Sequence, residues 1–296
     1  MTPTVTSTAA CIDIGTNTTR LLVAERDGAG IRPVISQRSH NCLGGAISVG
    51  GDIESEKIAQ VAETVRQQAQ SAREHGAIMI RAVATAAARD AGNRDELVRV
   101  IAERSGLTID VLDTADEARL AFRGATRLLR PDHDGAVAVI DVGGGSSEIA
   151  VGTPAQGVHW SRSFRVGSGI VAKQFLDSDP PARVECDAAR IHITAIFADC
   201  EFPTAERAIA IGNTSLSLAR LTGAELGRAG LESVIDLLCA APAAEVAVEL
   251  GLDVERVHVL PAGIMVLQEL SDRLGQPLRV GGGGVREGVL LELLDC

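Results

Sequence analysis

The chain has 296 residues, of which 46% are hydrophobic and 23% charged, so it can form two compact domains of about 150 residues each and is neither disordered nor of low complexity. Its net charge of −11, its single Trp, its five Phe and its lack of Tyr argue against nucleic-acid binding, which normally needs a basic face or stacking aromatic rings. We find no apolar run of membrane-spanning length, no leader pattern and no metal-ligand spacing among the six cysteines, so we expect a cytoplasmic protein with reduced thiols and no membrane contact.

An internal repeat organises the chain from its beginning. Residues 11–24 recur as residues 139–152, with Asp13 aligned on Asp141 and Arg20 on Glu148. Each copy has an apolar run, a turn rich in Gly, Thr, Asn or Ser, and a second apolar run, which is typical of a hairpin of two buried strands. The repeat therefore predicts two related domains.

Strand and helix signals alternate between the two copies, as in an α/β architecture. We expect strands over residues 78–83 and 109–112, and helices over residues 55–75, from Asn93 with a capping box at Glu96 to Gly106, and from Thr114 to about Leu129. The polar, turn-rich residues 130–135 are the candidate linker.

The second half is more helical. We expect helices over residues 182–200, over residues 232–250 with an interruption at Pro242, and from Pro261 at the first helical position to Leu274. A strand at residues 278–280, a glycine run at residues 281–284 and a helix over residues 285–294 follow.

The two predicted turns share a chemistry. Each would place several backbone N–H groups around one concavity that suits phosphate oxygens, and Asp13 and Asp141 end their strands where a carboxylate can hold Mg²⁺. Two ordinary hairpins, whose Asp and Ser side chains only cap turns, are the alternative. Two copies in the same register favour the phosphate site.

Residues 12–18 and 140–148 resemble the two phosphate-binding motifs of the exopolyphosphatase / guanosine pentaphosphate phosphohydrolase family, within the actin-like ATPase superfamily. Residues 83–90, 116–119, 166–169, 260–263 and 284–288 match the same family in order. The resemblance implies an α/β fold of two actin-like (ribonuclease H-like) domains, with mixed sheets flanked by helices and an interdomain cleft. We place domain I at residues 1–123 plus 281–296 and domain II at residues 124–280, a short two-domain form.

Glu117 matches the family's catalytic glutamate, which activates the attacking water. The residues alone also fit a capping box from Thr114 to Glu117, in which the Glu117 carboxylate would reach back to the start of its helix. The resemblance favours the catalytic role.

The resemblance further implies that Asp141 and Glu148 hold Mg²⁺, with Asp13 assisting. The expected substrate-binding residues are Asp13, Gly15, Thr16, Asn17, Thr18, Arg20, Arg89, Gly143, Gly144, Gly145, Ser146, Ser147 and Arg286. Arginine suits phosphate because its planar fork binds two oxygens at once, although an ion pair at the surface is the alternative role for each arginine. Cys42 stands where many relatives carry an arginine, and Asn213 and Leu216 depart from a family glycine-threonine loop at residues 212–217.

These expectations predict a Mg²⁺-dependent hydrolase that removes the terminal phosphate of inorganic polyphosphate, acting as a homodimer. The alternatives are a hydrolase of guanosine pentaphosphate or of nucleoside triphosphates such as ATP, a kinase of the same fold, and a non-catalytic sensor of polyphosphate or an alarmone. Because the chain is poor in aromatic residues, the composition favours a ligand without bases.

Overall fold

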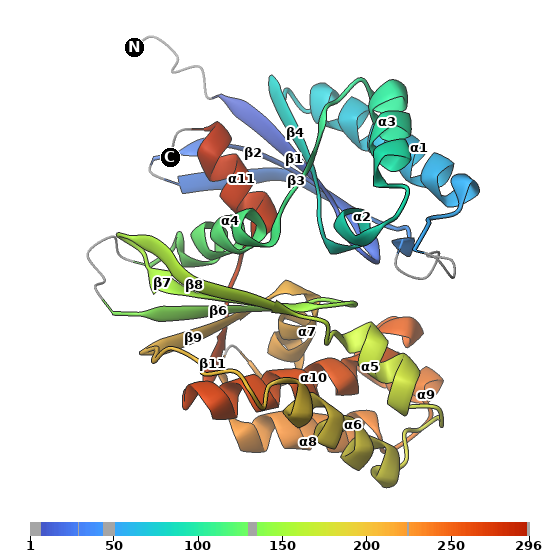
Figure 1. Ribbon diagram of the computed structural model, residues 1–296, viewed down its shortest axis with the longest axis vertical. Coiled ribbons are helices and arrows are strands. Elements are labelled where there is room, and N and C mark those ends of the chain that lie inside the picture. Colours follow the sequence, from blue (N-terminus) through green and yellow to red (C-terminus); the bar gives the residue numbers. More distant parts are fainter. Residues whose placement is uncertain (1–6, 29, 44–50, 130–134, 224, 295–296) are drawn as a thin grey trace. The chain divides into compact units, whose positions relative to one another are not determined.

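The computed structural model describes residues 7–28, 30–43, 51–129, 135–223 and 225–294. The chain forms two compact units, Met1–Arg127 with Gly283–Cys296 (unit 1) and Leu128–Gly282 (unit 2) (Figure 1). The expected boundaries, after residues 123 and 280, fall a few residues early, because the helix that begins at Thr114 continues to Thr126 within unit 1. Residues 130–134 of the predicted linker lie outside the described residues.

Unit 1 is built on a five-stranded mixed sheet in the order β3-β2-β1-β4-β5. Its strands are β1 (Thr8–Ile14), β2 (Thr18–Asp27), β3 (Gly30–His40), β4 (Met79–Ala84) and β5 (Ile109–Val111). Strands β1, β2 and β3 pair antiparallel, whereas β1, β4 and β5 pair parallel. Along β1, Ile12 and Ile14 enter one apolar core while Ala9 and Cys11 enter another, so helices can cover both faces of the sheet.

The helices of unit 1 divide between these two cores (Figure 1). Helices α1 (Ser55–Glu74), α2 (Ala86–Asp90) and α3 (Arg94–Ser105) pack on one, and α4 (Thr114–Thr126) and α11 (Val285–Leu293) on the other. A Cβ atom on Gly288 would lie 2.0 Å from the Leu120 carbonyl oxygen, so the backbones of α11 and α4 are in direct contact at this glycine. The C-terminal helix therefore belongs to the first unit.

Unit 2 repeats this plan with one more strand. Its sheet has the order β10-β11-β9-β6-β7-β8, in which β6, β9 and β11 run parallel and β6, β7 and β8 antiparallel. The strands are β6 (Val137–Val142), β7 (Ser147–Thr153), β8 (Gly157–Phe164), β9 (Arg207–Ile211), β10 (Glu225–Leu226) and β11 (Leu278–Val280). The series β8-β7-β6-β9-β11 has the pairing directions of β3-β2-β1-β4-β5, so the sequence repeat corresponds to a repeated sheet.

The helices of unit 2 gather around one long central helix, α10 (Val254–Leu274) (Figure 1). Around it lie α5 (Ser168–Phe175), α6 (Arg183–Ile196), α7 (Gly212–Thr222), α8 (Arg228–Leu238) and α9 (Ala243–Leu250). Every residue of α10 from 260 to 268 is buried. None of the helices in the described part of the chain is long and apolar enough to cross a membrane.

One expected helix start and one expected capping box are wrong. Helix α10 begins at Val254, so Pro261 lies inside the helix; burial of Val257 and Leu260 ahead of it outweighs the hydrogen bond that proline cannot donate. The expected capping box of α3 does not form, because the Asn93 side chain bonds both the amide and the carbonyl of Ile53 (2.9 Å each).

Candidate active site

Three neighbouring parallel strands of unit 1 end at one edge of its sheet. Strand β1 leads into the turn at residues 15–17, β4 into the short helix that carries Arg89, and β5 into the helix that carries Glu117. Ligands of open α/β sheets bind outside the carboxyl ends of the strands. The sheet of unit 1 therefore brings three separate predicted segments to the edge where a ligand is expected.

The turn between β1 and β2 is fixed through its backbone. The Gly15 amide donates to the Thr18 carbonyl (3.0 Å), and the Asn17 carbonyl accepts from the amides of Asn41 and Cys42 (3.0 and 3.1 Å). Cys42 thus contributes its backbone, which has a left-handed φ of 48°, whatever its side chain. The amides of Thr16 and Asn17 donate to no backbone acceptor among the described residues, so the turn presents them as donors for an anion.

A charged cluster stands beside this turn. Asp13 lies opposite Arg20 in the β1–β2 register, and Arg286 opens helix α11. The Asp13 Oδ1 atom is buried without a hydrogen-bond partner in the described chain. Burial raises the pKa of Asp13, while the positive charges of Arg20 and Arg286 act in the opposite direction. Two arginines and an incompletely bonded carboxylate therefore share one end of β1.

Glu117 is not part of a helix cap. The N-cap of α4 is Asp113, whose Oδ1 atom accepts from the Asp116 amide (2.8 Å), so the predicted capping box from Thr114 to Glu117 is wrong. Asp113 precedes Thr114 by one residue and is the stronger capping residue. Glu117 follows Asp116 in the first turn of α4, and its side chain accepts a hydrogen bond from the Nη1 atom of Arg89 (2.8 Å).

Arg89 makes a second bond from the same nitrogen, to the Leu112 carbonyl (2.9 Å). The Arg89 and Glu117 side chains are only 18% and 11% exposed, so this ion pair is mostly shielded from water. The sequence predicted Arg89 as a phosphate ligand or a surface ion pair, and Glu117 as the catalytic carboxylate or a capping residue, without a contact between the two. The structure joins them, which parallel pairing of β4 and β5 makes possible across 28 positions of the chain.

The turn between β6 and β7 in unit 2 has a different support. The Gly143 amide donates to the Ser146 carbonyl (2.9 Å), and the carbonyls of Gly143 and Gly144 accept three amides from the first turn of α5 (2.9 to 3.0 Å). These amides belong to Ser168, Gly169 and Ile170. The amides of Gly144, Gly145 and Ser146 donate to no backbone acceptor in the described chain, so they remain as donors.

Close packing holds that turn in place. A Cβ atom on Gly167 would lie 2.6 Å from the Gly144 carbonyl carbon, so only glycine permits this approach. The hydroxyl of Ser147, a predicted substrate ligand, is fully buried and donates to the Val166 carbonyl. Residues 166–169, which the sequence marked only as a match, therefore support the β6–β7 turn.

Asp141 and Glu148, the predicted metal ligands, lie opposite each other in the β6–β7 register. Glu148 accepts a hydrogen bond from the Ser163 hydroxyl (2.8 Å). Gly212 has a φ of 83°, and a Cβ atom on it would lie 2.3 Å from the Asp141 Oδ1 atom. The glycine-threonine stretch at residues 212–217 thus forms the first half of α7, and its glycine makes room for the Asp141 carboxylate.

The donor set of unit 2 suits magnesium. In the described residues, no group of three or more His, Cys, Asp or Glu side chains could hold a metal ion. Mg²⁺ is usually bound by one or two carboxylates, with water and substrate phosphates completing its shell. The facing pair Asp141 and Glu148 supplies two carboxylates, which fits that mode.

Comparison with known proteins decides the family. The model of the Ppx/GppA phosphatase family matches residues 22–296. The chain belongs to this family. Exopolyphosphatase 1 of Mycobacterium leprae is 28% identical over 302 residues, which cover 96% of this chain and 88% of that protein. Exopolyphosphatase 2 of Mycobacterium tuberculosis is 35% identical over 191 residues, which cover 61% and 59% of the two chains.

Solved structures of Ppx/GppA proteins show the same fold. The crystal structure of the Aquifex aeolicus family member has a TM-score of 0.85 at 24% identity and covers 98% of each chain. An exopolyphosphatase from Cytophaga hutchinsonii has a TM-score of 0.85 at 23% identity, with the same coverage. The expected actin-like fold of two α/β domains is confirmed. The expectation that the chain is an enzyme is also confirmed, because its family is a phosphatase family.

Proposed function

We propose that this Ppx/GppA protein is a Mg²⁺-dependent exopolyphosphatase, which hydrolyses the terminal phosphoanhydride of inorganic polyphosphate and releases orthophosphate. The observation that carries the proposal is the Glu117 carboxylate, held by Arg89 at the sheet edge that also bears Asp13, Arg20 and the β1–β2 turn. The two relatives named exopolyphosphatase support the choice of substrate.

In the proposed reaction, Glu117 takes a proton from water as the water oxygen attacks the terminal phosphorus. A new P–O bond forms, the bridging P–O bond breaks, and the shortened chain leaves with the electron pair. In unit 1, Arg20, Arg286 and the amide donors of the β1–β2 turn would hold phosphate oxygens. The amides of the β6–β7 turn offer donors of the same kind in unit 2. Asp141 and Glu148 would hold Mg²⁺, which neutralises phosphate charge when it is bound.

The placement of the aromatic residues favours a substrate without a base. Trp160, Phe164, Phe197 and Phe202 pack against one another, and Phe175 packs against His192. Phe122 is buried in α4. These are all the aromatic rings of the chain apart from its histidines, so each is already used in packing. A guanine ring would find no Trp or Phe reserved for stacking.

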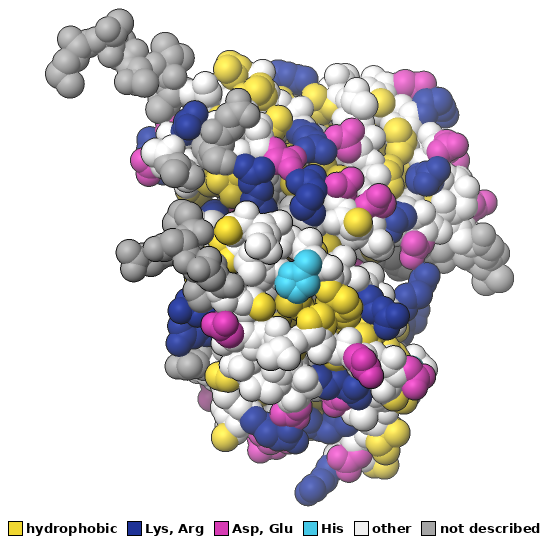
Figure 2. Space-filling model, turned by 60° about the vertical axis from the view of Figure 1, so that its left-hand side comes forward, with side chains coloured by type: hydrophobic (Ala, Val, Ile, Leu, Met, Phe, Trp, Pro, Cys, Tyr) yellow, Lys and Arg dark blue, Asp and Glu magenta, His cyan; other side chains and the backbone are white. Residues whose placement is uncertain are grey.

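The charges also fit a site made of a few local groups. On the face drawn in Figure 2, Lys and Arg side chains are interspersed with Asp and Glu side chains and form no broad basic surface. A chain with a net charge of −11 can therefore hold a polyanion only through concentrated arginines, backbone amides and bound cations. Homodimer formation and a cytoplasmic location remain sequence predictions.

The test is orthophosphate release by the purified chain from short polyphosphate, long polyphosphate, guanosine pentaphosphate and ATP, each with and without Mg²⁺. We expect release from polyphosphate, only with Mg²⁺, and much less from either nucleotide. Preferred hydrolysis of guanosine pentaphosphate or ATP would replace the proposed substrate. Binding of polyphosphate without release from any substrate would show a sensor instead of an enzyme.

A further inference from the structure

We propose that Arg89 is a positioning residue for the hydrolysis, which fixes the Glu117 carboxylate through one guanidinium nitrogen and meets a substrate phosphate through the other two. The inference rests on the proposed exopolyphosphatase function. It assigns to Arg89 a role in turnover that acts through Glu117, in addition to a contact with phosphate.

The first support is the pair of bonds from one nitrogen. Arg89 Nη1 donates to the Glu117 Oε2 atom (2.8 Å) and to the Leu112 carbonyl (2.9 Å). Leu112 directly precedes the N-cap of α4, and Glu117 lies near the start of that helix. Arg89 therefore bonds both the segment that leads into α4 and a side chain on its first turns, so its position determines the direction of the Glu117 carboxylate.

The second support is the rigidity of that anchor. The Leu112 amide donates to the Ala84 carbonyl (2.9 Å), which continues the pairing of β4 and β5. The Arg89 amide donates to the Thr85 carbonyl (3.0 Å), and the Thr85 amide donates to the Ile14 carbonyl at the end of β1 (3.2 Å). Arg89 is thus tied to the ends of all three parallel strands of unit 1.

The third support is that two guanidinium nitrogens of Arg89 are available for a ligand. Its Nε and Nη2 atoms have no partner among the described residues, and neither is a buried unbonded atom. A guanidinium has five N–H groups in a fixed fork, so these nitrogens can donate to phosphate oxygens while Nη1 keeps its two acceptors. One rigid group would then hold the base and the phosphate at a set spacing.

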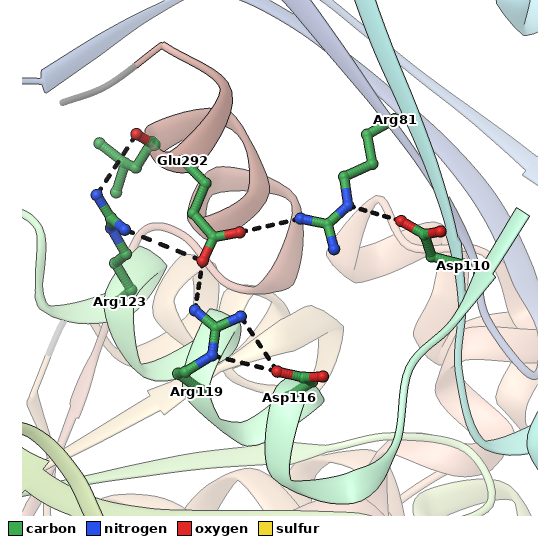
Figure 3. A network of polar contacts seen from close by, with 7 residues as sticks. Arg81, Asp110, Asp116, Arg119, Arg123 and Glu292 are labelled. Atoms are coloured by element: carbon green, nitrogen blue, oxygen red, sulfur yellow. Dashed lines mark hydrogen bonds and ion pairs between the residues drawn. The ribbon is translucent and has the colours of Figure 1, made fainter. Parts of the chain in front are cut away.

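Another arginine of unit 1 shows the contrast. Figure 3 shows Arg81 with its Nε atom on Asp110 (2.8 Å) and its Nη1 atom on Glu292 (2.9 Å). These two contacts join β4 to β5 and to the C-terminal helix, and neither involves a predicted catalytic or substrate-binding residue. Arg81 therefore offers a matched control, since it has two charged contacts in the same unit and none with Glu117.

The experiment is a double-mutant cycle on orthophosphate release from polyphosphate with Mg²⁺. It compares the wild type, Arg89→Gln, Glu117→Gln and the double variant, with Arg81→Gln as the control and thermal unfolding measured for each. We expect Arg89→Gln to lower kcat by about 10- to 100-fold when Glu117 is present, and to leave kcat within about threefold when Glu117 is already Gln. KM should rise by the same factor in both backgrounds, because the phosphate contact does not need Glu117.

The positioning role would be overturned if the two substitutions lowered kcat by independent factors that multiply in the double variant. An unchanged kcat in Arg89→Gln would also overturn it. An unchanged KM in both backgrounds would overturn the phosphate contact. If the wild type releases no orthophosphate, the proposed function itself fails and this inference fails with it, and that failure is visible before any variant is made. If Arg89→Gln does not fold, Arg89→Lys enters the same cycle, with the same expected dependence on Glu117.

Discussion

The β1–β2 turn of unit 1 and the β6–β7 turn of unit 2 close with the same hydrogen bond, from the amide of Gly15 or Gly143 to the carbonyl three residues later (3.0 and 2.9 Å). Their supports differ. The first turn is held by backbone amides that follow β3, and the second by the first amides of α5. A repeated strand pair can thus keep one turn geometry while the surrounding elements that hold it change.

The charges beside the two turns differ in a more informative way. Across the strands, Asp13 lies opposite Arg20 in unit 1, whereas Asp141 lies opposite Glu148 in unit 2. An acid facing an arginine suits a phosphate, and two facing acids suit a divalent cation. One exchanged residue in the repeat therefore places Asp13 opposite an arginine and Asp141 opposite a second acid. The predictions that follow probe the different roles proposed for these two pairs.

Among the substitutions beside the two turns, the one at Asp141 should have the largest effect. We expect Asp141→Asn to lower turnover at limiting Mg²⁺ by about 100-fold or more, because the ligand loses its charge, with partial recovery as Mg²⁺ is raised. Orthophosphate release measured across a Mg²⁺ series checks this, with the exposed Asp95→Asn as control. A loss that no Mg²⁺ concentration relieves would argue against a metal-binding role for Asp141.

The space beside Asp141 offers a sharper test of the same turn. Gly212 and Gly223, at the two ends of α7, both have positive φ, but a Cβ atom collides with Asp141 only at Gly212. Both alanine variants should lose about 1 to 3 kcal/mol of stability from backbone strain. Only Gly212→Ala should also lose turnover, by about tenfold or more, since the collision displaces a proposed metal ligand.

Equal turnover in Gly212→Ala and Gly223→Ala would show that the Asp141 position does not control the reaction. Thermal unfolding, measured alongside, separates this outcome from simple loss of folded protein.

On the anion side, Arg20→Gln should raise KM for polyphosphate by about 10-fold, because a charge-assisted hydrogen bond to phosphate contributes about 1.5 to 3 kcal/mol. The Mg²⁺ dependence should stay as in the wild type. Steady-state kinetics across both concentrations check the prediction. A shifted Mg²⁺ requirement with an unchanged KM would contradict the separate roles proposed for Arg20 and for Asp141.

The smallest effect concerns the Glu292 network, which joins α11 to the rest of unit 1 through Arg81, Arg119 and Arg123 (Figure 3). Burial alone would raise the pKa of Glu292, but the bonds and charges of Arg119 and Arg81 outweigh it and lower that pKa. The stabilisation is therefore complete above the unfolded pKa of a glutamate and is lost as pH falls through the lowered folded value.

At pH 7 we expect Glu292→Gln to lower Tm by about 2 to 4 °C, a modest change because these side chains are partly exposed. The difference from the wild type should shrink as the pH is lowered through the acidic range. A Tm difference that stays constant over that range would show that the charge of Glu292 does not stabilise the helix.

The sequence predicted the repeated hairpins well, because apolar runs broken by Gly, Thr and Ser turns are local signals. It failed where two local signals competed or where contacts were distant. Asp113, and not Thr114, is the N-cap of α4. Helix α10 continues through Pro261 because the residues on both sides of it are buried. The Arg89 bond to Glu117 depends on strand pairing that no local pattern contains.

The contacts that hold the two turns could not be predicted from the sequence either. Nothing local shows that the amides of α5 bond the Gly143 and Gly144 carbonyls, or that Gly212 leaves room for Asp141. A resemblance marked those segments as matches, but only the backbone geometry explains why glycine stands there.

The most direct test of the account is orthophosphate release and polyphosphate binding by Glu117→Gln beside the wild type, with the exposed Glu103→Gln as control. The account predicts that Glu117→Gln folds and binds polyphosphate as the wild type does, while kcat falls by about 100- to 10,000-fold because the water loses its base. Near-normal turnover in Glu117→Gln would contradict it.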